Sequence, residues 1–363
     1  MGFRKQTSIL VNIKGEKVKL VDMRKGIFDK IEKLQLKDRN IVVTGGAGFI
    51  GSHLAQELTR IGANVIIFDN VMRGEESFKN LKEIFECQNH PKFINGDIMD
   101  FEKVREAIKG ADLVFHLAAL PSHRRALERP REYMLVDVAG TVNVLEAARI
   151  TEPCPSVVFA SSNKVYGKQQ VPFVEDMMPK PEGPYGLAKY CSEETCKMYA
   201  KYYGLNIPVI RYHHVIGPRC QPDRELSIFT ERVINDKPPI VHGHFNPEEH
   251  FESCAADYTN IYDAVVGTIL TSSIKGFDVF NLATGKVTTV LRLAELVIEI
   301  LEKPHIKPEF REMLKHESLI HWSDVSKMNR ILGFKAECAV EESIKEYVEW
   351  RLKTGPRAQA IYV

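Results

Sequence analysis

Tyr185 and Lys189 are four positions apart, a spacing that places both side chains on the same face of a helix. An ammonium group beside a phenol lowers the pKa of the phenol, so Tyr185 can accept a proton from a substrate hydroxyl. Ser162 follows a predicted strand over residues 156–160, at the sheet edge where ligands bind, and is expected to hydrogen-bond the reacting oxygen. A serine there can also cap a turn or a helix. These three residues are the candidate catalytic group.

A glycine-rich turn over residues 45–51 joins a short apolar strand to a predicted helix. Glycine allows the tight turn, the approach of the backbone to a pyrophosphate and close packing of the helix. The helix N-terminus supplies N–H groups, so the pyrophosphate needs no lysine or arginine. Asp69 ends the next strand and is expected to bind the adenosine ribose. The negative charge of Asp69 favours NAD over NADP. The nearby Arg73 argues instead for NADP.

Two further segments are expected to contact the cofactor. Residues 96–98 end a third predicted strand and can hold the adenine edge. Residues 117–119 supply small side chains where the backbone must lie flat against the cofactor. The full set of residues expected to bind NAD is Gly45, Gly48, Phe49, Ile50, Gly51, Asp69, Asn70, Arg73, Gly74, Asp97, Ile98, Leu117, Ala118, Ala119, Tyr185 and Lys189.

Strands and helices alternate from residue 40 onwards, which predicts a parallel sheet covered on both faces. We therefore expect an α/β fold, a Rossmann-type doubly wound parallel sheet with a smaller C-terminal substrate-binding lobe. Strands are predicted over residues 41–44, 64–69, 92–97, 113–117, 156–160, 208–211 and 279–282. Helices are predicted over residues 27–34, 52–61, 101–109, 134–150, 185–203, 259–271, 291–303 and 341–353.

The pattern also predicts the domain organisation. Between Arg211 and about His250 the regularity is expected to give way to loops rich in Pro, His and Gly. Residues before 40 are expected to add a small hairpin and a helix in front of the main domain. The domains expected are an N-terminal extension (1–39), an NAD-binding domain (40–211, with 256–285 returning to it) and a substrate-binding lobe (212–255 and 286–363).

The composition excludes several classes of partner. Among 363 residues, 49 Lys and Arg balance 48 Asp and Glu, so the net charge of +1 attracts neither nucleic acid nor anionic membranes. No apolar run reaches the length of a membrane span and the start lacks a secretory signal, so a cytoplasmic protein is expected. Seven Cys without a CxxC pair argue against a disulfide framework or a zinc site. Several histidines lie between residues 213 and 250, but no acidic residue stands at a ligand spacing, so no metal is expected.

Four segments carry recognisable motifs: TGGAGFIG at 44–51, HLAA at 116–119, SSNKVYG at 161–167 and PYGLAK at 184–189. Together they resemble the extended short-chain dehydrogenase/reductases, in the NAD-dependent epimerase/dehydratase group that acts on nucleotide sugars. The resemblance covers about residues 40–353. It implies that the glycine turn and Asp69 bind NAD and that Ser162, Tyr185 and Lys189 form the catalytic triad. It also implies a homodimer through the helices 134–150 and 185–203.

The activity implied by this resemblance is that of an NAD-dependent nucleotide-sugar epimerase, which oxidises its substrate transiently to a keto-sugar and returns the hydride to the opposite face. A nucleotide-sugar decarboxylase, a dehydratase or a net NAD-dependent dehydrogenase of the same fold is the alternative. Asn163 and Lys164 replace the acidic pair that family dehydratases use, and the segment 163–167 is similar to CDP-tyvelose-type 2-epimerases. The hypothesis of another class is a non-catalytic NAD-binding sensor, against which the intact Ser, Tyr and Lys argue.

Three positions depart from the family pattern around the expected sugar-diphosphate site. Asp137 and His214 stand where the family has Asn, and His250 stands where it has the Arg that binds the diphosphate. These changes are compatible with an unusual nucleotide sugar, a substrate without a diphosphate or weakened activity. Replacement cations are expected among Arg124, Arg125, Arg219 and Lys315, although Lys and Arg are mostly exposed surface charges. The substrate-binding residues expected are Arg124, Ser162, Asn163, His214, Arg219 and His250.

Overall fold

The computed structural model describes residues 25–85, 90–245, 251–313 and 319–356. Its main sheet has seven parallel strands in the order β12-β6-β5-β4-β1-β2-β3. The chain moves outwards from β1 to β3 and then crosses to β4 on the other side of β1. Ligands bind outside the carboxyl ends of the strands at such a reversal. The strands are β1 (Asn40–Thr44), β2 (Asn64–Asp69), β3 (Lys92–Asn95), β4 (Leu113–His116), β5 (Ser156–Ser162), β6 (Ile207–Tyr212) and β12 (Phe277–Leu282).

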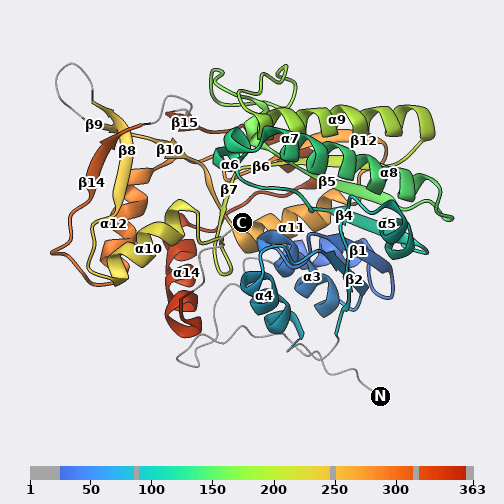
Figure 1. Ribbon diagram of the computed structural model, residues 1–363, viewed down its shortest axis with the longest axis horizontal. Helices are drawn as coiled ribbons and strands as arrows, with labels where there is room; N and C mark the ends of the chain where they lie inside the picture. Colours follow the sequence, from blue (N-terminus) through green and yellow to red (C-terminus); the bar gives the residue numbers. More distant parts are fainter. Residues whose placement is uncertain (1–24, 86–89, 246–250, 314–318, 357–363) are drawn as a thin grey trace.

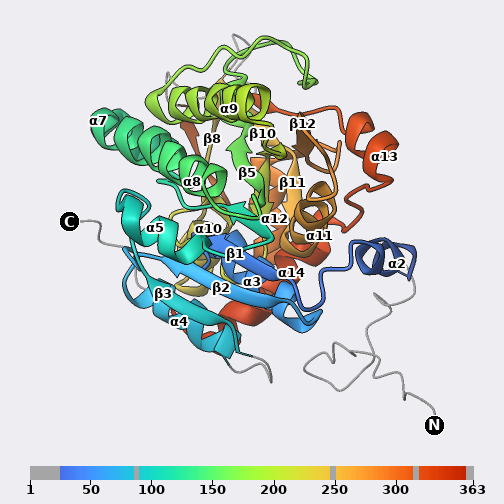
Figure 2. The same cartoon turned by 90° about the vertical axis from the view of Figure 1, so that its right-hand side faces the viewer.

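Helices cover both faces of this sheet (Figure 1, Figure 2). In β1, Val42 packs in one core cluster with residues of α5, α8 and α9, whereas Ile41 and Val43 pack in another with α3 and α11. Successive side chains of a strand point to opposite faces, so one short apolar run serves both cores. The predicted doubly wound α/β fold is confirmed. The helices are α3 (Phe49–Arg60), α5 (Phe101–Ile108), α8 (Gly140–Arg149), α9 (Pro184–Tyr203) and α11 (Ile261–Thr271).

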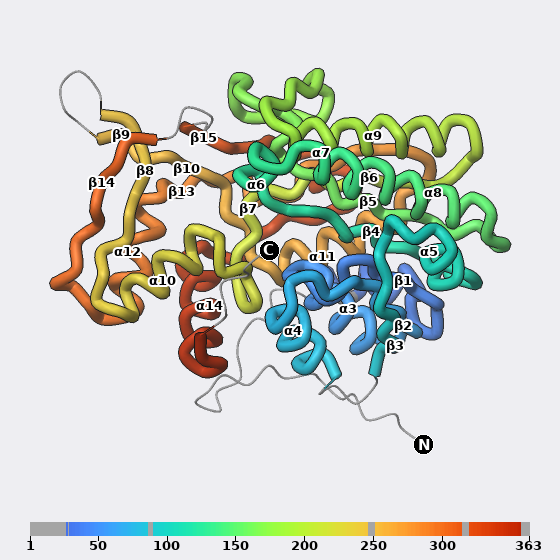
Figure 3. The backbone as a smooth tube through the Cα atoms, viewed as in Figure 1, coloured from blue at the N-terminus to red at the C-terminus, as the bar shows by residue number. Residues whose placement is uncertain are grey.

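A smaller lobe lies at the left of Figure 1 and Figure 3 and is built mainly from chain that follows β6. It holds the mixed sheet β14-β8-β9 and the two small sheets β13-β10-β15 and β11-β7. Phe229, Leu296 and Tyr347 from its helices belong to the same core cluster as α3 and α11, so the lobe and the main sheet share one core. Its elements are α10 (Glu225–Ile234), α12 (Val290–Ile300), α14 (Val340–Thr354), β7 (His214–Ile216), β8 (Ile240–Phe245), β9 (Phe251–Ser253), β10 (Ala255–Ala256), β11 (Tyr258–Asn260), β13 (Thr288–Thr289), β14 (Glu309–Glu312) and β15 (Ile320–His321).

Two expectations about secondary structure are wrong. The segment after Arg211, expected as loops, contains α10 and the strands β7 and β8. Leu226, Phe229 and Val233 form the buried stripe of α10, but neighbouring Pro, His and Gly residues hide its short periodic pattern. The helix expected over residues 134–150 begins as a π-helical turn η1 (Met134–Ala139), continues as α8, and is preceded by the short helix α7 (Pro130–Tyr133).

Some elements were missed or lie outside the described residues. Helices α4 (Glu75–Phe85), α6 (His123–Glu128) and α13 (Ser326–Leu332) were not predicted. The first predicted helix corresponds to α2 (Lys25–Lys33), whereas the hairpin expected before it lies outside the described residues. Within the described ranges, we find no helix with the length and apolarity that a membrane crossing requires.

Candidate active site

A cavity of about 600 Å³ opens along the carboxyl ends of the main strands. Gly45, Asp69, Leu117, Ser162 and Tyr212, which end or follow five different strands, all line it. Residues of β7 and of the start of α10 also line it, so both the sheet and the lobe contribute walls. The cavity therefore occupies the place where the topology predicts a ligand.

The glycine turn forms one end of the cavity because its backbone passes very close to neighbouring chain. Gly45 has φ +70°, and a Cβ on it would lie 2.7 Å from the Ala118 backbone nitrogen. A Cβ on Gly51 would lie 2.2 Å from the Gly45 carbonyl oxygen. Gly48 is the N-cap of α3, whose first turn has N–H groups without intrahelical acceptors. This turn therefore fits a pyrophosphate bound by backbone donors and a helix dipole.

Asp69 at the end of β2 holds two turns in place beside the cavity. Its carboxylate accepts hydrogen bonds from the backbone N–H groups of Ala47 at 3.0 Å and Val71 at 2.8 Å. Burial raises the pKa of Asp69, while these N–H groups and Arg73 oppose the rise. Beside it, Asn70 donates to Asp97 at 2.9 Å. An acidic residue held at this strand end fits the ribose of an adenine dinucleotide.

The structure brings together nearly all residues that the sequence assigned to NAD. Fifteen of them, all except Gly74, line the cavity. Gly74 has φ +55°, directly precedes α4 and lies outside the lining. The assignments stay predictions of cofactor contact.

Tyr185 and Lys189 lie in the first turns of α9, where Gly183 is the N-cap and Pro184 occupies the first helical position. The Lys189 ammonium is buried and donates to the Ala160 carbonyl at 2.9 Å. Ser162 ends β5 and also caps a 3-10 turn by accepting from the Lys164 backbone N–H at 3.2 Å. The catalytic and capping interpretations of Ser162 are therefore compatible.

The pKa of Tyr185 is raised to about 12, chiefly because the phenol is buried and also because the Asp137 carboxylate is near. Arg224 and a polar contact with Ser162 lower this pKa. In the structure the Arg224 charge is thus one cause that lowers the Tyr185 pKa, against the larger effect of burial. Arg224 comes from the N-cap of α10 and donates to the Pro121 carbonyl at 2.9 Å. No local sequence pattern links it to Tyr185.

The end of the cavity near Ser162 is lined by Asn163, Lys164, His213 and His214. Burial and the Lys164 charge lower the pKa of His213 to about 3 and that of His214 well below its ordinary value. Both imidazoles are therefore neutral at pH 7. The Lys164 ammonium donates to the neutral imidazole of His321 at 3.0 Å, which joins this end of the cavity to the lobe.

Two of the expected substrate-binding residues, Arg219 and Arg124, do not line the cavity. Arg219 is buried behind α3, where its guanidinium donates to Glu83 at 2.8 Å and to Gln56 at 2.9 Å. It joins α3 and α4 to the loop after β7, so its assignment to substrate is corrected. Arg124 is exposed on α6 and does not line the cavity, and its assignment to substrate stays a prediction. His250 and Lys315 lie outside the described residues. Arg125 does line the cavity.

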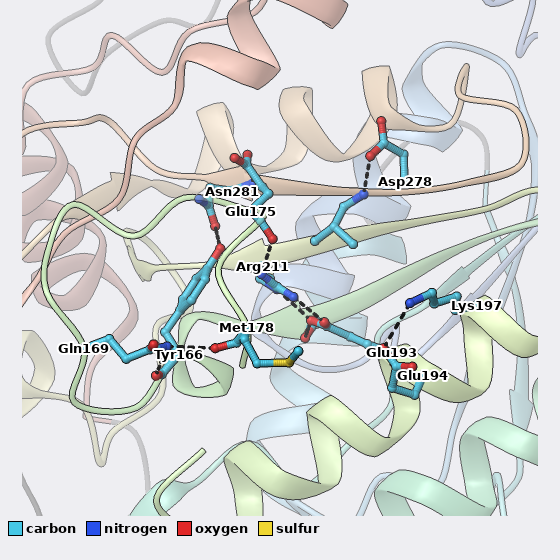
Figure 4. A network of polar contacts seen from close by, with 12 residues as sticks. Tyr166, Gln169, Glu175, Met178, Glu193, Glu194, Lys197, Arg211, Asp278 and Asn281 are labelled. Carbon is cyan, nitrogen blue, oxygen red and sulfur yellow. Dashed lines mark hydrogen bonds and ion pairs between the residues drawn. The ribbon is translucent and has the colours of Figure 1, made fainter. Parts of the chain in front are cut away.

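A buried ion pair supports the catalytic strand and helix from behind. Figure 4 shows Arg211 of β6 paired with Glu193 of α9, with nitrogen–oxygen distances of 2.7 and 3.0 Å. Glu193 lies one helical turn after Lys189, and it also accepts from Ser161 beside the candidate catalytic serine. Arg211 stacks 4.7 Å from the Tyr166 ring centroid. The pair thus couples β5, β6 and α9 at the cavity.

The fold and the site define a Rossmann-type protein with a dinucleotide cavity and a Ser–Tyr–Lys group. The model of the NAD dependent epimerase/dehydratase family matches residues 41–262, and the chain belongs to this family. A UDP-glucuronate 4-epimerase from Thermodesulfobacterium geofontis is 32% identical over 318 residues, which are 85% of this chain and 95% of the relative.

Solved structures agree with this assignment. The UDP-glucose 4-epimerase of Thermotoga maritima with UDP-glucose is 32% identical, with a TM-score of 0.77 over 87% of this chain and 99% of that one. The UDP-glucose 4-epimerase of Thermus thermophilus in complex with NAD is 28% identical, with a TM-score of 0.77 over 87% of this chain and 100% of that one. The predicted NAD-dependent nucleotide-sugar epimerase of the extended short-chain dehydrogenase/reductase type is confirmed. The decarboxylase and dehydratase alternatives are less well supported.

Proposed function

We propose that this protein inverts C4 of a UDP-linked hexose. The observation that carries the proposal is the convergence of Ser162, Tyr185 and Lys189 on the cavity that begins at the glycine turn. The related proteins named above are UDP-glucose and UDP-glucuronate 4-epimerases, which supports both the nucleotide and the carbon. A non-catalytic sensor would have no use for this group of side chains.

The proposed reaction assigns one step to each of the three side chains. Tyr185 accepts the proton of the C4 hydroxyl, and Ser162 donates a hydrogen bond to the same oxygen. A bound NAD would supply a reversible hydride acceptor for C4, and return of the hydride to the opposite face of the keto-sugar would invert that carbon. Tyr185 then returns the proton to the oxygen, so one turnover consumes neither protons nor cofactor. Lys189 and Asp69 are the residues that would hold the two ribose rings of NAD.

We also propose that the sugar carries a carboxylate. Lys164 is next to the reacting end of the cavity, and its charge lowers the pKa of His213, His214 and His321. Arg224 adds a second positive charge whose effect reaches Tyr185. Two cations beside neutral imidazoles favour an anionic sugar such as a uronate over a neutral hexose.

A substrate panel tests this function. The purified protein with its bound NAD is incubated with UDP-glucose, UDP-glucuronate and UDP-N-acetylglucosamine, and the configuration at each sugar carbon is followed by NMR. We expect inversion at C4, fastest with UDP-glucuronate, without net formation of NADH. Inversion at C2, loss of water or loss of carbon dioxide from the sugar would contradict the proposal.

The Lys164→Met variant should lose the preference for an anionic sugar. A hydrogen bond between charged groups is worth more than a neutral one, so kcat/KM for UDP-glucuronate should fall about tenfold to a hundredfold. The value for UDP-glucose should change little. Lys168→Met is the matched control, because Lys168 is exposed and pairs with Glu182 at 3.8 Å outside the cavity. Equal losses of kcat/KM for both substrates would show that Lys164 does not determine substrate specificity.

We further propose that the protein works in the cytoplasm as a homodimer through α8 and α9, which lie side by side in Figure 2. Val142, Met198 and Tyr202 on these helices are exposed by 36%, 38% and 69%. Exposed apolar side chains on neighbouring helices are typical of an interface. Sedimentation velocity should therefore detect a dimer that the Met198→Lys/Tyr202→Lys variant dissociates. Phe78→Lys, at an exposed apolar residue of α4, should leave it intact. A monomeric wild-type protein would disprove the proposal.

A further inference from the structure

Asp137 lies in the π-helical turn η1, immediately behind the wall of the catalytic cavity. Its side chain is only 1% exposed. Oδ1 accepts a hydrogen bond from the Leu120 backbone N–H at 2.8 Å, whereas Oδ2 is buried with no hydrogen-bond partner among the described residues. A buried carboxylate oxygen without a donor is costly, and π-helical turns occur frequently at functional sites. The position therefore calls for an explanation beyond packing.

The backbone of Asp137 is fastened to the catalytic helix. Its carbonyl accepts a hydrogen bond from the Ser192 hydroxyl at 3.0 Å, and Ser192 lies three residues after Lys189 on α9. The same carbonyl accepts from Thr141, whose hydroxyl lies 3.1 Å from His116 Nε2 on β4. These contacts fix the backbone of Asp137 against α9.

The titratable groups around Asp137 lie on α9, α7 and β4. On α9 they are Tyr185 and Lys189, and on α7 the nearby group is Tyr133. The Asp137 charge raises the pKa of both tyrosines. Burial lowers the pKa of Lys189, and the Asp137 charge opposes this lowering. His116 is neutral, because burial and Lys189 lower its pKa to about 3.

Other groups also act on the same neighbours. Arg125 lowers the pKa of Tyr133, and Arg224 lowers that of Tyr185. Glu193 and Cys196 add to the effect of Asp137 on Lys189. The pKa of Asp137 itself is raised to about 6 by burial, against Lys189 and the Leu120 N–H, so its carboxyl is mainly ionised at pH 7.

We propose that Asp137 is a positioning residue for the epimerase reaction: its buried carboxylate, held behind the cavity wall, supplies the negative charge that compensates the Lys189 side chain and acts on the Tyr185 hydroxyl. The proposal depends on the roles of Tyr185 and Lys189 given above. In the resting site, Asp137 and Lys189 balance each other in charge, so the phenol stays protonated until positive charge arrives beside it. A neutral amide at this position would leave the ammonium uncompensated and the phenol easier to ionise.

The Asp137→Asn variant tests this inference because it keeps the shape of the side chain and removes its charge. With NAD-loaded enzyme, the rise of kcat that accompanies Tyr185 ionisation should move to lower pH by about one unit. A second readout is the pH titration of tyrosinate absorbance without any sugar, with Tyr185→Phe subtracted, and it should move in the same direction. This titration remains informative even if the substrate assignment is wrong.

The control is Glu146→Gln, which makes the same change at a surface carboxylate of α8 that pairs with Arg149. It should leave both midpoints unchanged. If the amide of Asp137→Asn does not fit, Asp137→Ser replaces it. This side chain is smaller and also neutral, and we expect the same shift of both midpoints. Unchanged midpoints in a folded neutral variant would overturn the proposal, because a purely structural Asp137 would alter stability but not the Tyr185 titration.

Discussion

Replacing Tyr185 with Phe lowers kcat by about 10²- to 10⁴-fold, the usual contribution of a positioned acid–base group. Phe retains the ring, which packs edge-on against Tyr133 with 6.3 Å between centroids, and loses only the hydroxyl. The effect should therefore fall on proton transfer and leave the fold and the bound NAD in place. Initial rates with saturating UDP-sugar measure kcat, and native mass spectrometry measures the NAD that is retained.

Lys189→Met should also abolish most turnover, but with a different signature. Because Lys189 is the residue that would hold a ribose of NAD, this variant should retain less cofactor than Tyr185→Phe does. Tyr203→Phe removes a hydroxyl from an exposed position at the end of the same helix and is the control with unchanged kcat. Turnover near that of the wild type in both Tyr185→Phe and Lys189→Met would eliminate the proposed mechanism.

Arg211→Met destabilises the protein by about 3–5 kcal/mol, because it leaves the Glu193 carboxylate buried without its cation. The two side chains are only 4% and 3% exposed and their nitrogen–oxygen distance is 2.7 Å. Urea unfolding followed by intrinsic fluorescence measures the loss. Since Glu193 supports α9 and β5 beside the catalytic residues, kcat should fall together with stability.

The double variant Arg211→Met/Glu193→Met removes both charges of the buried pair. Without a lone buried charge, it should be more stable than Arg211→Met alone. Arg105→Met is the control, because Arg105 pairs with Glu102 at an exposed site and surface pairs contribute little. A loss in Arg211→Met no larger than in this control would show that the buried pair is not needed for stability.

The local part of the site was predictable because its signals lie close together in the chain. The turn at 45–51 follows a strand and precedes a helix, and Gly45 and Gly51 are positions where any Cβ would collide with backbone. Asp69 ends the adjacent strand, and Tyr185 and Lys189 share one helix. Each of these relations is decided by a few neighbouring residues, so spacing alone revealed them.

The substrate end was less predictable because its residues come from distant parts of the chain. Arg219 looked like a free cation, but in the fold it is bound to Glu83 and Gln56. Arg224 has no pattern that links it to Tyr185, and Lys164 meets His321 across 157 positions. Spacing could not show which of these charges face the cavity.

The sequence alone determined the alternating fold, the NAD turn and the Ser–Tyr–Lys group, because periodicity, glycine stereochemistry and helical spacing act over short distances. The tertiary structure alone decided the electrostatics of that group. The sequence shows only that residue 137 is acidic. In the fold, Asp137 is buried behind the cavity, and its charge acts on both Tyr185 and Lys189. Charges interact through space and according to their burial, and only folding sets these two quantities.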